Sequence, residues 1–398
     1  MSQEREEKEA LVARLIELVQ EADGDLSSEG LIEADPKAFK RARMLFGSWE
    51  EALVATLVQA CQGSRRRKLT KRAVTVEEDH QRTAAEGWDG PVVLFTDQRR
   101  CCVINGDSLE TFRSGVIKPQ PLLLGDQPAT LTMAVANPNE DVLVVISDRG
   151  LLYPLDARVI PHASAPTTRT VADVTGMASD EHVVAVMPRL WLLGADRFVH
   201  ATTQGRIKGS ASRDFGRMQD RDGTVAFLLA PEDRVCGAFA QRPEHGAIFC
   251  ANAQGNGIHF KTKDIRTMGL RAQGVKSMTL GDDGDEVIGA LPVSGEEQIV
   301  VLSAGGQGKR VPLSQFRIQG RAGQGMILMR PGGSDRLASL VAVDGPDDDL
   351  LVWTAQGNVA RLAASAIPLL DRSARGQSLV ALEGGDQIVG ACRLPGSG

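Results

Sequence analysis

The sequence predicts a mainly β protein, a propeller-like ring of six sheets preceded by a small all-α domain. Three observations support this fold class. From Pro91 onward, short runs rich in Val, Ile and Leu are broken by Gly, Asp, Asn and Pro, which is typical of strands and turns. Two separate motifs in this region recur with one period of about 50 residues. Before it, apolar residues recur at helical spacing.

Residues 1–62 are expected to form the all-α domain. Apolar side chains between Leu11 and Val19 recur at helical spacing after a charged first turn. A second helix is predicted over residues 36–45, with a proline at an early position where its missing N–H costs nothing. Ser48 and Glu51 make a capping box for a third helix.

Residues 63–90 are expected to form a flexible linker that is first basic and then acidic. SRRRKLTKR, residues 64–72, carries six positive charges and no negative one, and EEDHQRTAAEG follows it. Such polar segments cannot bury enough apolar surface to fold alone. The β domain is therefore predicted over residues 91–398.

The first repeated motif is a strand, a glycine turn and a second short strand. Its copies are LVVISDRGLLYPL (143–155), FVHATTQGRIKGS (198–210), AIFCANAQGNGIHF (247–260), IVVLSAGGQGKRVPL (299–313) and LLVWTAQGNVARL (350–362). PVVLFTDQRRCCVI (91–104) is a sixth copy that lacks the glycine. Six hairpins of this kind predict six sheets.

The second motif is DRVCGA at 233, DEVIGA at 285, DRLASL at 335 and DQIVGA at 386, with starts 52, 50 and 51 residues apart. DEHVVAV at Asp180 fits as an earlier copy. Each unit holds about four short strands, and such a sheet cannot bury both faces alone. Six sheets stacked radially into a closed disc would bury them. An open solenoid is the structural alternative.

Composition excludes several classes of protein. No apolar run reaches the roughly 18 residues that span a bilayer, and the charged start MSQEREEKEA is unlike a signal peptide, so we expect a cytoplasmic protein without a membrane partner. The six cysteines form no CxxC pair, and the six histidines show no metal-ligand spacing. No phosphate-binding G-x-x-x-x-G-K-[ST] loop is present. We therefore expect no cofactor, no metal and no catalytic site.

The net charge of −6 argues against a uniformly basic nucleic-acid binder but leaves room for a segregated basic face. Residues 298–334 contain no Asp or Glu, and acids gather between repeats. Duplex DNA is bound mainly through cations that release counterions from its phosphates. The candidate contacts are Arg206, Lys208, Arg213 and Arg217 in the third repeat; Lys261, Lys263, Arg266, Arg271 and Lys276 in the fourth; Lys309, Arg310, Arg317, Arg321 and Arg330 in the fifth; and Arg65, Arg66, Arg67 and Lys68 in the linker.

The repeats resemble the C-terminal domain of the DNA gyrase A protein and its topoisomerase IV counterpart. The resemblance rests on the strand, the T-x-x-G turn and the glycine- and arginine-bearing loop of SAGGQGKRVPLSQFRIQGRAGQGMILM, residues 303–329. It covers roughly residues 91–392 and is strongest over 245–392. It implies a six-bladed β-pinwheel that binds duplex DNA around its basic outer edge and bends it.

That family also carries a loop motif, Q-R-R-G-G-K/R-G, which is important for wrapping DNA. Here the matching stretch is residues 319–325, in which Gln319, Arg321, Gly323 and Gly325 agree. Gly320, Ala322 and Gln324 depart from the motif by replacing an arginine, a glycine and a basic residue. The departures argue against tight chiral wrapping, and they leave plain binding and bending as the expected activity, with Gln319 among the contacts.

The breakage core of a type II topoisomerase has no counterpart in this sequence. Such a core is hundreds of residues long and uses a nucleophilic tyrosine. The only tyrosine, Tyr153, lies in the strand LLYPL of a repeat, where we expect it to pack.

Residues 39–56, FKRARMLFGSWEEALVAT, are similar to the homing-endonuclease-associated repeat, a small helical DNA-binding module. Phe46, Gly47, Ser48, Trp49, Ala52 and Leu53 match its core. A helical packing or dimerisation domain is the alternative for this segment.

We therefore expect a non-enzymatic DNA-binding protein of the bacterial nucleoid that binds and bends duplex DNA, influences its topology and reads little sequence. The first alternative is an interaction scaffold that docks a type II topoisomerase subunit or another chromosome-associated partner. The second is a propeller enzyme with a metal in its central channel.

Overall fold

The computed structural model describes Leu11, Arg14 and Arg41, each in helical conformation, and residues 88–124, 127–137, 142–165, 169–216, 218, 223–281 and 284–396. The chain divides into two compact units, Met1–Arg82 and Thr83–Gly398. Apart from those three residues, the helices and the linker predicted before residue 88 lie outside the described residues.

The second unit is built from six β-hairpins, which we number as blades 1 to 6 in chain order. The first strands are β1 (Pro91–Thr96), β8 (Val142–Ser147), β12 (Arg197–Thr202), β16 (Ala247–Asn252), β20 (Gln298–Ser303) and β24 (Asp349–Thr354). Their partners are β2 (Arg100–Asn105), β9 (Leu151–Asp156), β13 (Arg206–Ala211), β17 (Asn256–Lys261), β21 (Gln307–Pro312) and β25 (Asn358–Ala363).

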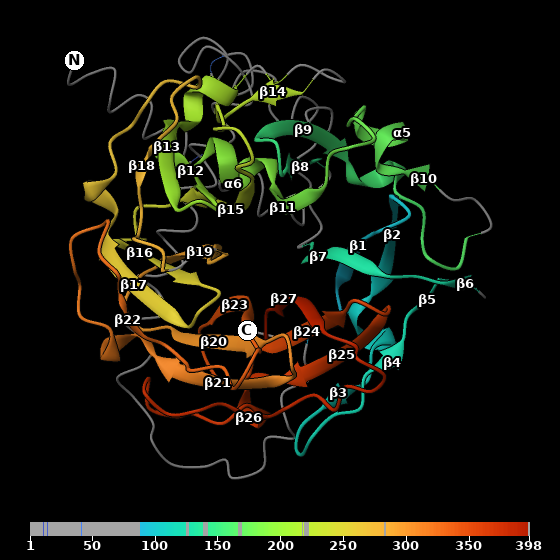
Figure 1. Ribbon diagram of the computed structural model, residues 1–398. Coiled ribbons are helices and arrows are strands. Elements are labelled where there is room, and N and C mark those ends of the chain that lie inside the picture. Colours follow the sequence, from blue (N-terminus) through green and yellow to red (C-terminus); the bar gives the residue numbers. More distant parts are fainter. Residues whose placement is uncertain are drawn as a thin grey trace. The chain divides into compact units, whose positions relative to one another are not determined.

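Each hairpin gains an inner strand from its own repeat. These strands are β7 (Leu131–Ala136), β11 (Val183–Pro188), β15 (Val235–Gln241), β19 (Val287–Val293), β23 (Leu337–Val343) and β27 (Ile388–Leu394). The inner strands of neighbouring blades contact one another around a ring, and β27 contacts β7. Figure 1 shows them nearest the centre of the ring.

The outer strand of each blade comes from the following repeat. β10 (Arg169–Thr170), β14 (Thr224–Val225), β18 (Val275–Lys276), β22 (Met326–Ile327) and β26 (Gln377–Ser378) complete blades 1 to 5 in that order. This exchange of strands links each blade to its neighbour. The mainly β fold with six propeller-like blades is thereby confirmed.

The same exchange closes the ring. β3 (Thr111–Phe112) runs parallel to β25 in blade 6, and β4 (Gln120–Pro121) runs antiparallel to it. The first repeat therefore supplies the outer edge of the last blade (Figure 1). The closed disc, rather than the open solenoid, is the observed architecture.

The hydrophobic core lies between blades. Side chains alternate along a strand, so Val300 and Leu302 of β20 pack in one cluster with blade 6, whereas Ile299 and Val301 pack in another with blade 4. Six clusters of buried residues fill the six interfaces in this way. Strands buried on both faces read as continuous apolar runs, which explains the IVVL and LVVI patterns.

The hairpin turns explain both repeated motifs. The turn glycine has positive φ in blades 2 to 6, and Arg99 takes its place in blade 1 with φ 61°. The aspartate of the second motif caps the turn: in blade 6, Asp386 Oδ1 accepts hydrogen bonds from the N–H groups of Gln356 (2.9 Å) and Gln387 (2.8 Å). Asp233, Asp285 and Asp335 accept the corresponding bonds in blades 3 to 5.

The remaining elements are short. They are η1 (Gly106–Ser108), η2 (Ala157–Val159), η3 (Ser212–Phe215), η4 (Thr262–Asp264), η5 (Leu313–Gln315), η6 (Ala364–Ala366), α5 (Val171–Thr175), α6 (Arg189–Leu193), β5 (Leu123–Leu124) and β6 (Gln127–Pro128). Among the described residues, no helix has the length and apolar character needed to cross a bilayer.

Candidate nucleic-acid interface

The candidate interface is made by three loops of equal length on the outer edge of the ring. After its hairpin, each repeat forms a short 3-10 turn, reaches the second hairpin strand of the preceding blade, and loops outward before donating its outer strand. We call residues 267–274, 318–325 and 369–376 the outer loops of blades 4, 5 and 6. They begin beside Gly209, Phe260 and Arg310, respectively.

The base of each outer loop is fixed by a buried or half-buried polar side chain of an earlier blade. Arg197 Nη1 donates to the carbonyl of Ile265 (2.5 Å), His259 Nδ1 donates to that of Phe316 (2.9 Å) and Arg310 Nε donates to that of Ile367 (2.8 Å). These three carbonyls are equivalent in the repeat. The outer loops of all three blades therefore start from the same backbone position.

Exposed cations recur on and beside these loops. Arg266 and Arg317 are exposed at equivalent positions that immediately precede two of the loops. Within the loops, Arg271 and Arg375 are exposed, and Arg372 is half-buried. Exposed arginines thus lie on or directly before the outer loops of blades 4 to 6, and of these Arg266 and Arg317 occupy equivalent positions in the repeat.

Three of the predicted contact residues lie in the interior, which corrects the sequence-based expectation for them. Lys208 and Lys309 are 0% exposed and Arg310 is 9% exposed. The Arg310 guanidinium donates to Ile367 O and, through Nη1, to Gln298 Oε1 at 2.7 Å. Burial lowers the pKa of each lysine ammonium to about 8. These three cations bind the protein itself and present no surface to a phosphate.

Arg321 is partly exposed and partly bound to the protein itself. Its side chain is half-buried, and its Nε and Nη1 donate to the carbonyls of Asp264 and Lys276, both at 3.1 Å. Gln319 is half-buried, and its N–H donates to His259 O at 2.8 Å. These two residues hold the blade 5 outer loop against blade 4.

The other predicted residues are spread over several places. Arg206, Arg213, Lys261, Lys263, Lys276 and Arg330 are all exposed. Arg206 and Lys276 are neighbours in register on β13 and β18, and Lys261 and Lys263 flank the start of η4. Arg330 lies after β22 and lines a hollow with Asn256 and Ile327. Arg217 and the linker residues Arg65 to Lys68 fall outside the described residues.

Sequence reasoning missed Arg372 and Arg375. They stand in LDRSARGQ, where an adjacent aspartate hid them from a search for segments without acids. The signal that could have found Arg372 is the repeat itself, because Arg372 follows Arg321 by 51 residues, whereas Arg375 follows Gln324.

Few carboxylate side chains are available on the outer loops. The four motif aspartates have their carboxylates committed to turn N–H groups. On the three outer loops themselves, Asp371 is the acid among the described residues, and its Oδ1 accepts from Gln315 Nε2 at 3.1 Å. The outer loops therefore keep a net positive charge.

A shallow hollow of about 430 Å³ lies on the outer edge between blades 4 and 6. Gln324, Gly325, Asn256 and Arg372 are among the residues that line it. Leu280, Met326 and Ile327 form part of its wall, and the backbone, amide and guanidinium groups beside them suit an anionic ligand.

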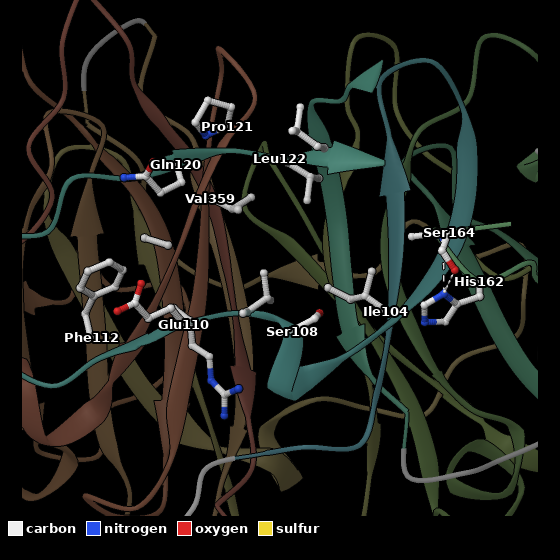
Figure 2. Close-up of a pocket in the computed structure, with 15 residues that line it drawn as sticks. Ile104, Ser108, Glu110, Phe112, Gln120, Pro121, Leu122, His162, Ser164 and Val359 are labelled. Carbon is white, nitrogen blue, oxygen red and sulfur yellow. Dashed lines mark hydrogen bonds between the residues drawn. The ribbon is translucent and has the colours of Figure 1, made fainter. Parts of the chain in front are cut away.

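A second hollow, of about 440 Å³, lies where blade 6 meets blade 1 (Figure 2). Ile104, Leu122, Phe112 and Val359 give it an apolar lining. At one side, His162 Nδ1 lies 2.8 Å from Ser164 Oγ. No metal-binding group of three or more His, Cys, Asp or Glu side chains occurs among the described residues.

Tyr153 is a packing residue, as expected. It is 2% exposed, and its hydroxyl donates to Glu181 Oε1 at 2.8 Å in the interior of blade 2.

Comparison with known proteins agrees with this architecture. Residues 247–294, 297–344 and 348–391 match the model of the family described as DNA gyrase C-terminal domain, beta-propeller. The DNA gyrase A protein of Escherichia coli (strain K12) is 26% identical over 264 residues, which are 66% of this chain and 30% of the relative. The gyrase A protein of Synechocystis is 29% identical over 297 residues, 65% of this chain and 34% of the relative. The chain thus spans about a third of the length of these curated relatives.

Two solved structures share the fold. A gyrase A C-terminal domain aligns with a TM-score of 0.65 and 20% identity over 76% of this chain and 99% of that one. The C-terminal domain of DNA topoisomerase IV aligns with a TM-score of 0.58 and 18% identity, over 78% and 94% of the two chains. Residues 247–391 therefore carry three repeats that match the gyrase C-terminal family, and the six blades of this chain have the fold of the gyrase A C-terminal domain.

Proposed function

We propose that the β domain binds duplex DNA along its outer edge and bends it, largely without reading sequence and without catalysing a reaction. One observation carries the proposal: exposed arginines lie on or directly before the outer loops of three successive blades, whereas the repeated aspartates face the hairpin turns. The similarity to DNA gyrase A proteins supports DNA as the ligand.

The chemistry of the loops fits phosphates better than base edges. Guanidinium groups make strong, geometrically defined contacts with phosphate oxygens. Contacts to phosphates position a duplex but carry no sequence information directly. The domain should act on the bacterial nucleoid, and a type II topoisomerase subunit is a second partner that the same similarity suggests.

Neutralising the exposed outer-loop arginines together tests the proposal. The variant Arg266→Gln, Arg271→Gln, Arg317→Gln, Arg375→Gln should weaken duplex binding and flatten its salt dependence. Each lost phosphate contact reduces the slope of log K against log salt by about 0.9. Fluorescence anisotropy with a labelled duplex at several salt concentrations measures both quantities.

The matched control is Arg336→Gln. Arg336 is also exposed, but its Nη2 pairs with Glu286 Oε1 at 2.7 Å away from the outer loops. This variant should bind like the wild type. Equal losses in the control and the outer-loop variant, or no duplex binding by the wild type at low salt, would contradict the proposal.

The apolar hollow between blades 6 and 1 favours a second candidate function, that of a protein-docking scaffold. Leu123, which lines it, is 56% exposed. An apolar side chain of a partner could fill such a hollow. Leu123→Asp should then abolish capture of a purified type II topoisomerase subunit while leaving DNA binding unchanged, and capture that survives this change would remove the candidate.

A further inference from the structure

Two buried lysines organise outer loops from beneath. Lys309 Nζ donates to the carbonyls of Asp371 (2.8 Å), Arg372 (2.8 Å) and Ala374 (2.7 Å), all on the blade 6 outer loop. An ammonium group has three protons, and all three are used. No carboxylate among the described residues pairs with Nζ. The loop is therefore wrapped around a cation supplied by blade 5.

Lys208 of blade 3 makes the same arrangement with the blade 4 outer loop. Its Nζ donates to the carbonyls of Gly269 (3.1 Å) and Leu270 (2.7 Å) on the blade 4 outer loop. It also lies 5.2 Å from the centre of the Phe227 ring, a favourable cation–π position. Lys208 and Lys309 occupy the same position in their hairpins, one residue before Gly209 and Arg310.

The third outer loop lacks this device. Ile258 occupies the lysine position in blade 4, and it is fully buried. The blade 5 outer loop is instead held by its own Arg321, as described above. An aliphatic residue therefore satisfies packing at this position, so the burial of an ammonium group needs another reason, because burying a charge is costly.

The reason lies in how the lysine orients the peptide groups. In a planar trans peptide the C=O and the following N–H point in opposite directions. Carbonyls that converge on Lys309 Nζ therefore direct the N–H groups of Arg372, Ser373 and Arg375 away from it. The N–H of Arg372 donates to Gln315 Oε1 at 2.8 Å. Ser373 and Arg375 are exposed, and their N–H groups donate to no acceptor among the described residues. The corresponding groups over Lys208 are those of Leu270 and Arg271.

We propose that these two lysine-held loops are phosphate-binding sites, and that Lys208 and Lys309 are the positioning residues that create them. Outward N–H groups above a buried positive charge form an anion-binding concavity. The arginine side chains on the same loops add charge-assisted bonds to the same phosphate. The inference rests on the proposed function, since the phosphates are those of duplex DNA. The buried lysines act on this ligand indirectly, through the loops that they hold.

The test replaces the ammonium with an apolar group of similar length. In Lys309→Met the three carbonyls lose their donor, so amide hydrogen exchange over residues 369–376 should become faster in the free protein. Duplex affinity should fall about tenfold, as expected for the loss of charge-assisted hydrogen bonds. Lys309→Gln, which keeps two N–H donors, should restore part of the affinity.

A double-mutant cycle separates positioning from general damage. If Lys309 acts through the loop, Lys309→Met should cost much less affinity in an Arg372→Gln, Arg375→Gln background than in the wild type. Ile258→Met is the matched control, because it alters the same position in the neighbouring blade, and it should change neither the exchange of residues 318–325 nor the affinity.

The outcomes discriminate. Faster amide hydrogen exchange with unchanged duplex affinity would contradict the phosphate-binding site while leaving DNA binding intact. The same holds if Lys309→Met lowers the affinity equally in both backgrounds. A wild type that binds no duplex would contradict the proposed function and this inference together. Unchanged exchange in Lys309→Met would show that the lysine does not hold the loop.

Discussion

At the scale of single residues, the outer loop of blade 5 shows how a sequence departure is accommodated. Ala322 stands where the family motif has glycine, and it adopts φ 67°, a left-handed conformation in which the alanine side chain is strained. Its N–H donates to Ser277 O at 2.6 Å, which holds the backbone in place. The loop therefore keeps the shape that the glycine would have allowed freely.

Restoring the glycine should stabilise the protein. Ala322→Gly relieves the strain but also frees the unfolded chain, so the free energy of unfolding should rise by about 1 kcal/mol or less. Ala374→Gly is the matched control: it is a loop alanine without positive φ, and the same change there should lower the free energy of unfolding. Urea denaturation measures both, and a loss of stability in Ala322→Gly would contradict the strain.

The buried lysines give a pH dependence with a definite sign. Burial holds the pKa of Lys309 at about 8 in the folded protein, below the value of about 10.4 of a free lysine. Below pH 8 both states are protonated and the cost of burial is fully present. Between these pH values the unfolded chain binds more protons, so the free energy of unfolding contributed by this residue rises with pH, by at most about 1.4 kcal/mol per pH unit.

The measurement compares the wild type with Lys309→Met by urea denaturation between pH 7.5 and 9.5. The wild type should gain stability relative to the variant as the pH rises. A difference between the two proteins that stays constant over this range would show that Lys309 keeps its ordinary pKa.

At the scale of elements, the repeat unit was predictable because its hairpin is rich in local signals. Glycine at the turn and apolar runs on both sides predicted five hairpins, the apolar runs alone predicted the sixth, and the aspartate motif confirmed the period of the repeat. The outer strands were not predicted, because pairs such as Val275–Lys276 are too short to show periodicity. Their pairing with the preceding blade depends on tertiary contacts that a single sequence does not reveal.

The candidate site divides in the same way. Arg266, Arg271 and Arg317 were identified because basic residues cluster there with few or no acids, and they lie exposed on the outer edge. Lys309 and Arg310 belong to the same cluster, but strand alternation and strand exchange bury them beneath the next repeat's loop. The clustering of basic residues along the sequence thus indicated the region of the interface. Which of them reach its surface depends on burial in the fold.

The turn-capping aspartates give a prediction at this scale. Burial alone would raise the pKa of Asp386, but hydrogen bonds from Thr354 Oγ1 (2.6 Å), Asn358 Nδ2 (2.9 Å) and two backbone N–H groups outweigh it and lower the pKa. Asp386→Ala leaves these donors without their acceptor and should cost about 2–4 kcal/mol of the free energy of unfolding.

Gln387→Ala is the neighbouring control and should cost much less, because no described hydrogen bond uses the Gln387 side chain. Chemical denaturation of both variants measures the difference. Equal losses in the free energy of unfolding would mean that the turn capped by Asp386 does not contribute to stability.

At the scale of the whole domain, the outer loops stand on successive blades of a closed ring (Figure 1). A duplex that contacts all three loops must follow the curvature of that ring. Bending a short site by 40–90° costs roughly 1–6 kcal/mol, which several phosphate contacts can offset. Binding and bending are therefore expected from one set of residues.

Ligase-mediated circularisation of a duplex of about 150 base pairs, one persistence length, tests the bend. The wild type should increase the yield of circles, and the four-arginine outer-loop variant should not. Closing relaxed plasmid with ligase in the presence of protein adds the sign of any linking-number change. Tight binding without increased circularisation would limit the domain to straight DNA.

The claim on which the account rests is that DNA lies on the outer loops. Arginine-selective chemical modification, mapped by mass spectrometry with and without duplex DNA, locates the ligand directly. Arg266, Arg271, Arg317 and Arg375 should be protected by DNA, whereas Arg336 should react equally in both samples. Protection of Arg336 with the outer-loop arginines left reactive would place the duplex elsewhere and contradict the account.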